Sequence, residues 1–581
     1  MRKGFTSAQI GRFFQEGPRL ENIFLTSPIM KPFLRRHLPP SEFSEVAGDL
    51  EAFGERARGE LWDLAQECEA NQPRLEQYTP WGKREDRIIT CGAWKALKKI
   101  SIEEGVVGIA YERKRGAYSR LHQMMKAALF HPSSAFVTCP LSMTDGAAKT
   151  LEALKRENGS DEVGEAYSRL ISTDPDKAWT SGQWMTERGG GSDVANGCET
   201  TAYPREGEDG FNLHGYKWFS SAIDADMALT LGRIHLHGAE SVKLSLFYLP
   251  VRQPEGGSLN GIQVVKLKNK LGTRQLATGE LLLDGTRAHL LGQPGRGVAN
   301  IAHMLAITRV HTAVGAVSAT RRMMQMAVDY AKKREAFGKL IMEHALHSKT
   351  LAEIEVELRG MELFVFHCVL LQGKEDVGEA LDRERLLLRI LLPLLKGYVP
   401  PRTMQLMTQL LEAFGGQGYI EDTGIPTLFR DNQVNPIWEG TTNIQAHDLV
   451  RSIHKTHGEV LQAFGSSLEE LTKKSKNAHP SCTQLLSDFN ALMKFLKDNP
   501  QLLPVVARHL ALDLARIYTG ALLWDHAVAR EGKPGWEVDR AAALRYTAWL
   551  PGPSTLKLHG LEAYSENAQR MDQDLLHPVD A

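Results

Sequence analysis

The sequence predicts an α+β protein with an N-terminal helical domain, a middle antiparallel β domain, a C-terminal helical bundle and additional C-terminal helices. Two observations predict this fold class. The spacing of hydrophobic residues changes from helical to strand-like and back along the chain, and no self-similar period indicates a repeat protein. The 581 residues, of which 42% are hydrophobic and 24% charged, have the composition of a globular protein with a large buried core.

A first helical domain is expected over residues 40–176, after an N-terminal arm of residues 1–39. The positions that recur at helical spacing include Leu61, Leu64, Ala65 and Cys68. Residues 177–294 instead hold short runs rich in Val, Leu, Tyr, Phe and Thr, separated by Gly, Asn and Asp, which is typical of strands and turns. This change of pattern predicts the β domain.

Helical spacing returns over residues 295–452, where one apolar stripe consists of Ile307, Val310, Val314 and Val317. A polar linker at residues 473–481 and further amphipathic stretches follow. Residues 453–581 are therefore expected to form an additional helical region.

Composition excludes a general attraction to nucleic acid or to an anionic membrane surface, because 69 Lys and Arg are balanced by 70 Asp and Glu. No stretch of about 18 uncharged apolar residues predicts a membrane-spanning helix. The six cysteines are dispersed and form no CxxC motif. They indicate a reducing compartment and no metal site.

The first 15 residues carry Arg2, Lys3 and Arg12 and no acidic residue. This pattern is compatible with a short mitochondrial presequence, although the segment lacks the usual length and richness in Ser and Arg, which favours an ordinary arm. A mitochondrial location is the expectation, with a cytoplasmic location as the alternative.

The densest local motif runs from Trp184 to Asp193, with the sequence WMTERGGGSD after a strand-like run. Consecutive glycines let backbone N–H groups approach a flat ring or a phosphate, and Thr186 and Ser192 add hydroxyl donors. A flexible surface turn is the alternative, because glycine-rich turns are common. The motif has neither the lysine of a Walker loop nor the βαβ surroundings of a Rossmann turn.

Two further motifs place aromatic or cationic groups at the ends of elements. In GYKWFSSA at residues 215–222, strand alternation puts Trp218 and Phe219 on opposite faces, so that one ring fills the core while the other covers a planar ligand. Two packing aromatics are the alternative. Arg334, in the sequence REAFGK, ends a long helix, where it either binds pyrophosphate or caps the helix.

The fourth motif combines a glycine cluster with a single carboxylate. Residues 414–419 (FGGQGY) end one helix, and residues 438–443 (WEGTTN) precede the next. The apolar neighbours of Glu439 are expected to raise its pKa and make it a usable proton acceptor. Alternatively, Thr442 caps the following helix and Glu439 faces water.

Together, in this order and on a background of helices, sheet and helices, the four motifs resemble the acyl-CoA dehydrogenase superfamily. The resemblance covers roughly residues 38–451. Within the superfamily, the sequence HLPP at residues 37–40, Trp438 ahead of Glu439, and the extra C-terminal helices are similar to the AidB-like branch.

The resemblance implies FAD as the cofactor, held between the β domain and the C-terminal helices. The cofactor-binding residues that it implies are Gln183, Met185, Thr186, Gly191, Ser192, Phe219, Ser221, Thr441 and Asn443. By the same resemblance, Arg334, Phe337 and Gly416 reach the adenine dinucleotide half of a neighbouring subunit's FAD. This implies a homo-oligomer, at least a dimer and, as in the family, a tetramer.

Two positions depart from the family pattern. Ala345 stands where family patterns have a glutamine, and Glu412 stands where many members have a glutamine that touches the pyrophosphate. AidB-like sequences differ from the pattern at the same places, so these departures favour the branch and not the loss of FAD.

The implied reaction is α,β-desaturation of a fatty acyl-CoA. A base removes the α-proton while the β-hydrogen leaves as hydride to flavin N5, so base and flavin must bracket the Cα–Cβ bond. Glu439 is the expected base, and Arg309 is expected to orient the acid or the substrate. Some family members carry the base on the helix of Arg309, but Thr308 cannot serve. Electron-transfer flavoprotein is the electron acceptor that the family suggests.

Two other classes of function remain as alternatives. A flavoprotein that sequesters long-chain acyl-CoA, and so regulates lipid metabolism with little turnover, would use the same pocket. AidB-type DNA binding in the alkylation response is disfavoured, because residues 451–581 hold 15 Lys and Arg against 15 Asp and Glu. Lys473, Lys474 and Lys476 form a local basic run, which in a polar linker is usually only solvated.

Overall fold

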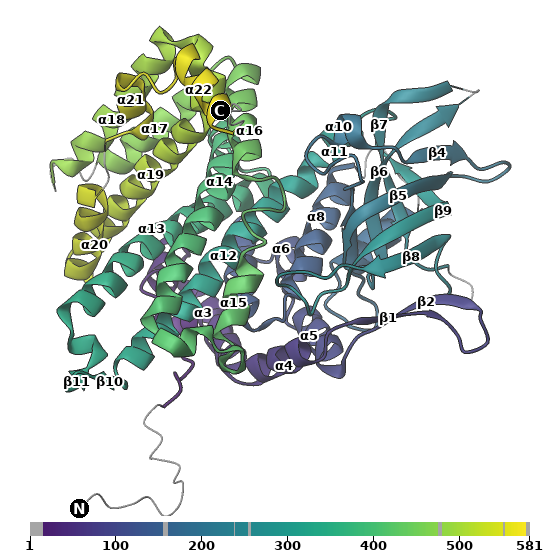
Figure 1. The fold of residues 1–581 in the computed structure, drawn as a ribbon, viewed down its shortest axis with the longest axis horizontal. Coiled ribbons are helices and arrows are strands. Elements are labelled where there is room, and N and C mark those ends of the chain that lie inside the picture. Colours follow the sequence, from purple (N-terminus) through teal and green to yellow (C-terminus); the bar gives the residue numbers. More distant parts are fainter. Residues whose placement is uncertain are drawn as a thin grey trace, which may run out of the picture.

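The structure, a computed structural model, describes residues 16–154, 161–236, 239–253, 257–473, 479–549 and 552–576. The predicted fold class is confirmed: a helical body carries a β domain on one side and additional C-terminal helices on the other (Figure 1). Among these residues, no helix combines the length and the hydrophobicity needed to cross a membrane. The basic segment of residues 1–15 and the lysines at 474 and 476 lie outside the described residues.

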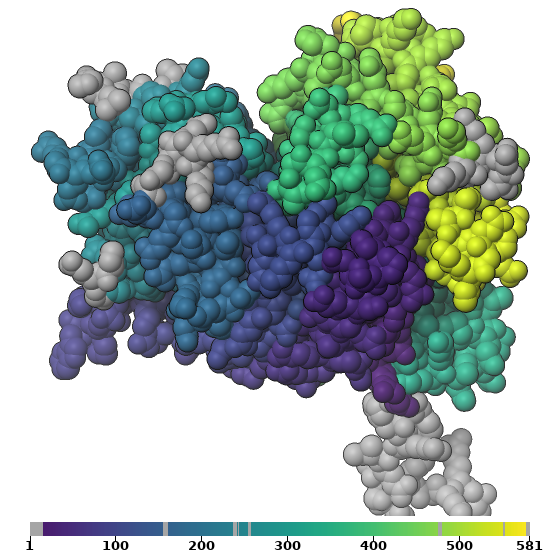
Figure 2. All heavy atoms as spheres, turned by 180° about the vertical axis from the view of Figure 1, so that it is seen from behind, coloured from purple at the N-terminus to yellow at the C-terminus, as the bar shows by residue number. Residues whose placement is uncertain are grey.

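The first helical domain contains α1 (Ile23–Thr26), α2 (Met30–His37), α3 (Pro40–Arg58), α4 (Glu60–Ala70), α5 (Gly92–Glu103), α6 (Gly108–Glu112), α7 (Tyr118–Phe130), α8 (Thr138–Leu154) and α9 (Asp161–Leu170). The helices α1 and α2 lie within the stretch for which the sequence predicts an arm. Their side chains Phe24 and Leu34 are fully buried. On the back of the molecule this purple segment lies against the yellow-green C-terminal helices (Figure 2), where Arg36 pairs with Asp525 at 2.7 Å.

A β-hairpin interrupts this region, which the sequence predicts as wholly helical. Its strands are β1 (Arg74–Tyr78) and β2 (Arg84–Ile89). The buried Asp86 accepts the backbone N–H of Val264 at 3.0 Å, and the Gln77 amide donates to the Val264 carbonyl at 3.0 Å. The hairpin therefore extends from the helical domain to the edge of the β domain. The alternating sequence RLEQY, before a turn with proline and glycine, is the signal that could have revealed it.

The β domain holds β3 (Ser181–Trp184), β4 (Thr201–Pro204), β5 (Phe211–Ser221), β6 (Met227–Leu236), β7 (Ala239–Pro250), β8 (Ile262–Leu267) and β9 (Thr278–Leu291). The pairing order β6–β4–β5–β9–β7 returns to β6, so the strands close on themselves around a core that includes Leu213, Phe247 and Leu281. Most pairings are antiparallel, as predicted, but β3 and β4 both run parallel to β6.

The two parallel strands lie end to end along one edge of β6. Trp184, the last residue of β3, pairs with Thr230, and Thr201, the first residue of β4, pairs with Arg233. Residues 185–200 therefore form a loop between two strands that pair with the same edge of β6, at positions only three residues apart. We call this loop the excursion. This excursion, which includes the short α10 (Val194–Gly197), carries the glycine-rich motif.

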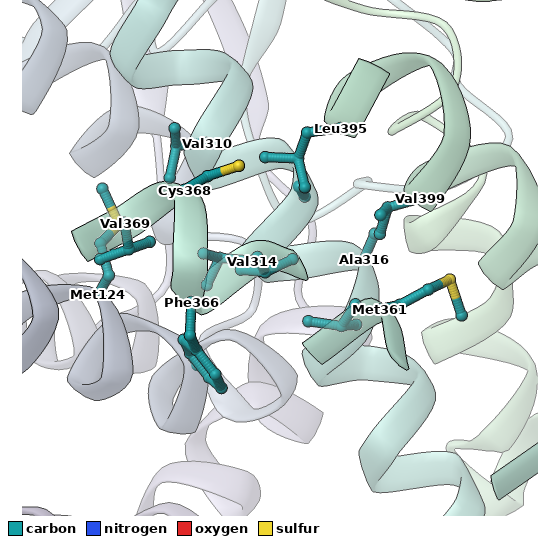
Figure 3. Packing of buried hydrophobic residues seen from close by; sticks show 14 of the residues in the cluster. Met124, Val310, Val314, Ala316, Met361, Phe366, Cys368, Val369, Leu395 and Val399 are labelled. Carbon is teal, nitrogen blue, oxygen red and sulfur yellow. The ribbon is translucent and has the colours of Figure 1, made fainter. Parts of the chain in front are cut away.

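The second helical domain consists of α11 (Gly297–Asn300), α12 (Ala302–Ala331), α13 (Ala345–Asp376), α14 (Asp382–Ala413), α15 (Ile425–Asn432) and α16 (Thr442–Lys455), with a short hairpin of β10 (Glu335–Ala336) and β11 (Lys339–Leu340). Its core forms where α12, α13 and α14 meet α7, and Figure 3 shows Val314, Phe366, Leu395 and Met124 packed there. Apolar residues surround α12 on all sides because other elements cover most of its surface.

The additional C-terminal region is helical, as predicted. It contains α17 (Glu459–Lys473), α18 (Ser481–Asp498), α19 (Leu503–Ala529), α20 (Trp536–Trp549), α21 (Ser554–Gly560) and α22 (Glu566–Leu576). The long helix α19 packs against α13, α14 and α16 of the second helical domain. The region is thus part of one continuous core with the helical body.

A buried ion cluster joins three helices of that body. Arg120 on α7 contacts Asp145 on α8 at 2.7 Å and Asp376 at the end of α13 at 2.6 Å. Burial alone would raise the pKa of both carboxyl groups, but the Arg120 guanidinium keeps the pKa of each below its usual value. The cluster requires all its charges, because each would be costly if it were left alone.

Replacing Arg120 with Met is expected to lower the free energy of unfolding by about 3–5 kcal/mol at pH 7, since two buried carboxylates lose their shared cation. Depressed carboxyl pKa values contribute stability above the unfolded pKa of about 3.9 and lose it as pH falls. The difference in free energy of unfolding between the unmodified protein and Arg120→Met should therefore become smaller below about pH 5. Urea unfolding followed by circular dichroism measures this free energy.

The matched control is Arg169→Met, which breaks the exposed pair with Glu165 and should cost at most about 1 kcal/mol. Equal losses for the two variants would contradict a special role for the buried cluster.

Candidate active site

A cavity of about 560 Å³ lies between the β domain and the two helical domains. Its walls come from α8, the excursion after β3, the end of β5, residues 268–278, α12, and the segment from α15 to the start of α16. This volume is within the range of small-molecule sites, about 300–1,000 Å³. Glu439 is the one acidic side chain among the described residues that line it.

Glu439 sits in a tight turn between α15 and α16. Its φ angle is +56° and that of Gly440 is +93°, so two successive residues adopt the left-handed conformation, which is costly for a glutamate. Thr308 of α12 donates its hydroxyl to Glu439 Oε2 at 2.8 Å. The turn therefore aims the carboxylate at the α12 wall of the cavity.

Burial raises the pKa of Glu439, while the Thr308 hydroxyl, the Arg309 and Lys396 cations and the Gln183 side chain oppose that rise. Glu439 is partly accessible, but its accessible part faces the cavity and not the outer surface. Its carboxylate is therefore still largely removed from bulk water. A carboxylate with a raised pKa that faces a cavity is suited to accept a proton.

Arg309, which is expected to orient the acid or the substrate, forms its hydrogen bond with a different carboxylate. Its guanidinium donates to Asp448 Oδ2 on α16 at 2.7 Å. Asp448 also binds Arg389 and Arg451. Arg309 therefore acts on Glu439 through its charge and through the fixed position of α16.

The same cavity brings together seven residues that the sequence predicts to bind the cofactor. They are Gln183, Met185, Thr186, Gly191, Ser192, Phe219 and Ser221. A Cβ atom on Gly191 would lie 3.1 Å from the Thr186 hydroxyl, so glycine keeps the loop tight at this point. The Gln183 side-chain oxygen is buried and has no hydrogen-bond partner among the described atoms. An unpaired polar atom and glycine-spaced hydroxyls beside an aromatic ring fit an isoalloxazine ring.

The aromatic pair in β5 differs from its prediction, because neither ring fills the core. Trp218 is partly buried with the Lys268 ammonium 3.4 Å from its ring centre, and Phe219 is 46% exposed at the cavity. The register of β5 against β9 shifts between Lys217 and Ser220. This bulge disrupts the strict alternation on which the prediction depends. The buried residue is instead Lys217.

Lys217 anchors the loop that carries the glycine-rich motif. Its ammonium, fully buried, contacts Glu187 Oε1 at 2.6 Å. Glu187 also accepts the Thr200 hydroxyl and the Glu199 backbone N–H, each at 2.6 Å. One carboxylate thus connects the start of the excursion to its end. These contacts favour an ordered loop over the flexible surface turn that was the alternative.

A second cavity, of about 470 Å³, contains Arg334 and Gly416 together with Phe414 and Gln417. It shares no lining residue with the first cavity. His347 lines it with its Nε2 atom buried and without a hydrogen-bond partner among the described atoms. Phe337, predicted to join this group, is 97% exposed on the turn between β10 and β11, outside the cavity lining.

Thr441 and Asn443, also predicted to bind the cofactor, lie outside the linings of both cavities of the single chain. Thr441 is the N-cap residue of α16 and is exposed. Asn443 accepts a hydrogen bond from Arg508 of α19 at 2.7 Å. Their role in binding the cofactor stays a prediction.

Three residues around Glu439 were not anticipated from the sequence as partners of the carboxylate or its turn. Thr308, which cannot be a base, is its hydrogen-bond donor. Lys396 and Gln445 bind the carbonyl groups of the turn. The position of Thr308 beside Arg309 was a usable signal, whereas Lys396 stands 43 residues from Glu439 in an apolar helix and carries no local signal.

The chain matches four family descriptions in succession. They are "Adaptive response protein AidB N-terminal domain" over residues 18–172, "Acyl-CoA dehydrogenase, middle domain" over residues 182–286, "Acyl-CoA dehydrogenase, C-terminal domain" over residues 295–454, and "Acyl-CoA dehydrogenase 11 C-terminal domain-like" over residues 459–577. These matches and the helix–sheet–helix fold define one class of protein, that of the acyl-CoA dehydrogenases.

Comparison with whole proteins agrees. Acyl-CoA dehydrogenase family member 11 of Caenorhabditis elegans is 47% identical over 94% of this chain and 90% of its own. Putative acyl-CoA dehydrogenase AidB of Escherichia coli is 29% identical over 69% of this chain and 72% of its own. The crystal structure of C. elegans ACDH-11 in complex with C11-CoA superposes with a TM-score of 0.94, at 44% identity and 99% coverage of both chains. The chain belongs to the acyl-CoA dehydrogenase family, and its AidB-like character is confirmed.

Replacing Lys217 with Met is expected to cost about 3–5 kcal/mol of stability, because Glu187 is left as a buried, unpaired charge. The double variant Lys217→Met/Glu187→Gln should regain most of that loss, since the amide needs no counter-ion. Thermal unfolding of the three proteins measures both effects. A double variant no more stable than Lys217→Met would show that the pair's charge is not what holds the loop.

Proposed function

We propose that this protein is an FAD-dependent acyl-CoA dehydrogenase that introduces a double bond between Cα and Cβ of a fatty acyl-CoA, with Glu439 as the base. The observation that carries the proposal is the arrangement of the cavity. A single carboxylate with a raised pKa lines the cavity together with the seven expected flavin-binding residues, and Gln183 lies beside that carboxylate. A substrate thioester bound between Glu439 and the flavin would present its α-proton to Glu439.

Each residue has a defined part in this reaction. FAD, when bound, supplies the acceptor for the hydride that leaves Cβ. Glu439 takes the α-proton, and Thr308 orients the carboxylate through its hydroxyl. The Glu439 turn fixes the direction of approach, and Ile437 and Trp438 next to it give this part of the cavity an apolar lining.

The relatives support the substrate class. ACDH-11 of C. elegans was crystallised with C11-CoA, and its fold covers 99% of this chain. We therefore propose a fatty acyl-CoA as the ligand of the first cavity. Chain length and branching are properties that a substrate series would establish.

The second cavity supports a subunit-spanning cofactor site. Arg334 and Gly416 lie in it, apart from the flavin-ring residues. We propose that they meet the adenine dinucleotide half of FAD held by a neighbouring copy. A homo-oligomer, a tetramer by family analogy, and electron-transfer flavoprotein as electron acceptor follow as parts of the same proposal.

Sequestration of acyl-CoA is the second candidate, and one observation favours it. The ACDH-11 crystal structure contains an acyl-CoA in complex with the protein, so that a relative of the same architecture holds this ligand long enough to be observed. In this reading the same cavity binds acyl-CoA and Glu439 is seldom used.

The test replaces Glu439 with Gln in the FAD-loaded protein. Under anaerobic conditions, undecanoyl-CoA should bleach the flavin absorption of the unmodified protein. The variant should keep its flavin and bind the acyl-CoA, but bleach about 10²–10⁴ times more slowly, because the base is absent. Stopped-flow absorbance measures the rate.

Asp422→Asn, at an exposed acid of the neighbouring loop, is the matched control and should bleach like the unmodified protein. Unchanged bleaching in Glu439→Gln would remove Glu439 from its proposed role. If the unmodified protein forms a stable complex in which the flavin stays oxidised for hours, sequestration replaces dehydrogenation as the function.

A further inference from the structure

A lysine lies buried directly behind the Glu439 turn, outside the cavity lining. Lys396 is on α14 and is only 1% exposed. Its ammonium donates to the Gly440 carbonyl at 2.8 Å. A fully buried lysine is rare unless it is paired, because loss of its hydration is costly. Its position therefore needs an explanation that the cavity itself does not supply.

The turn is held from two helices at once. Gln445 of α16 donates its amide to the Glu439 carbonyl at 2.8 Å and to the Gly440 carbonyl at 3.2 Å. Lys396 binds the second of these carbonyls from α14. Gly397 lets the helices approach, since a Cβ atom there would lie 3.2 Å from Gln445 Cβ. Together these contacts stabilise two successive left-handed residues, which the backbone alone disfavours.

Two cations, Arg309 and Lys396, both lower the pKa of Glu439 and so share the role of counter-ion. Arg309 also pairs with Asp448 at 2.7 Å. Lys396, by contrast, forms no ion pair within 4.0 Å in the described parts of the chain, and its one hydrogen bond there is to a neutral carbonyl. Its charge and that of Glu439 attract each other.

We propose that Lys396 is a positioning residue that holds the Glu439 turn and whose ammonium charge keeps the buried carboxylate ionised and ready to accept a proton. This inference rests on the proposed function for its meaning in catalysis. Burial lowers the pKa of Lys396 to about 7, and the Glu439 charge opposes that change. Each group therefore helps the other remain charged.

The two roles of Lys396, as a hydrogen-bond donor and as a charge, can be separated. Gln445 also donates to the Gly440 carbonyl, and to that of Glu439, but is neutral, so it provides the matched comparison. Lys396→Met keeps a side chain of similar length but removes its positive charge. Gln445→Leu removes hydrogen bonds and no charge, and Lys396→Arg keeps the positive charge. The other ionisable groups near the turn, unchanged in all three variants, are Arg309, Asp448, Arg389, Arg451, Cys139 and Lys270.

The direct measurement is the titration of Glu439 in the FAD-loaded protein by infrared spectroscopy, using the carboxyl band that is absent in Glu439→Gln. A nearby opposite charge lowers a carboxyl pKa, so Lys396→Met should raise that of Glu439. Gln445→Leu should leave it near its original value, and Lys396→Arg should restore it. An unchanged titration in Lys396→Met, or an equal shift in Gln445→Leu, would overturn the charge role.

A second measurement needs no titration and keeps the test decisive if Lys396→Met is unstable. If the two charges stabilise each other, the loss of stability caused by removing the Lys396 charge should be smaller once the Glu439 charge is also removed. The loss of thermal stability caused by Lys396→Met should therefore be smaller in a Glu439→Gln background than in the unmodified protein. Equal losses in the two backgrounds would contradict the coupling.

Failure of the proposed function would look different. In that case undecanoyl-CoA would not bleach the flavin of any variant, while the titration and the stability cycle would still report the Lys396–Glu439 coupling. If the function holds, the acid limb of the pH profile for bleaching should move to higher pH in Lys396→Met and stay in place in Gln445→Leu.

Discussion

The burial of a single carboxylate in a strained turn is the constraint on which the rest of the site depends. Glu439 must be close enough to the cavity to meet a ligand and far enough from water to have a raised pKa. Left-handed backbone at two residues and a desolvated charge both cost free energy. The surrounding structure offsets these costs with a hydroxyl, an amide and two cations from three different helices.

The glycine-rich loop at the cavity meets a different constraint, because a loop suited to contact a ligand must be open to it and still have one shape. The edge of the sheet is interrupted between β3 and β4, and the residues released form the glycine-rich excursion. Glu187, near the start of the excursion, is buried; its carboxylate accepts hydrogen bonds from Glu199 and Thr200 at the other end and pairs with the buried Lys217. These contacts anchor the loop to the sheet.

The additional C-terminal helices stabilise the site without lining it. The helix α19 packs against α14 and α16, the two helices that hold the Glu439 turn from behind, and Arg508 binds Asn443 in the first turn of α16. E. coli AidB matches 69% of this chain, whereas the C. elegans relative matches 94%. The additional C-terminal helices share the core of the helical body. This arrangement gives them a structural role near Glu439, the candidate base. The sequence of this region has no excess of basic over acidic residues that would favour binding to DNA.

The sequence by itself determined the order of helical and β regions, the family, Glu439 as the single candidate base and seven candidate flavin-binding residues that the structure brings to one cavity. It could do so because hydrophobic periodicity and glycine motifs are local properties. Only the tertiary structure decided the partners of that base. Thr308, Lys396 and Gln445 come from three helices, and no local pattern relates them. The bulge in β5, which leaves both Trp218 and Phe219 outside the core, was likewise beyond local reasoning. Register and helix rotation are set by packing against distant segments, and one residue of register moves a side chain to the other face of a sheet.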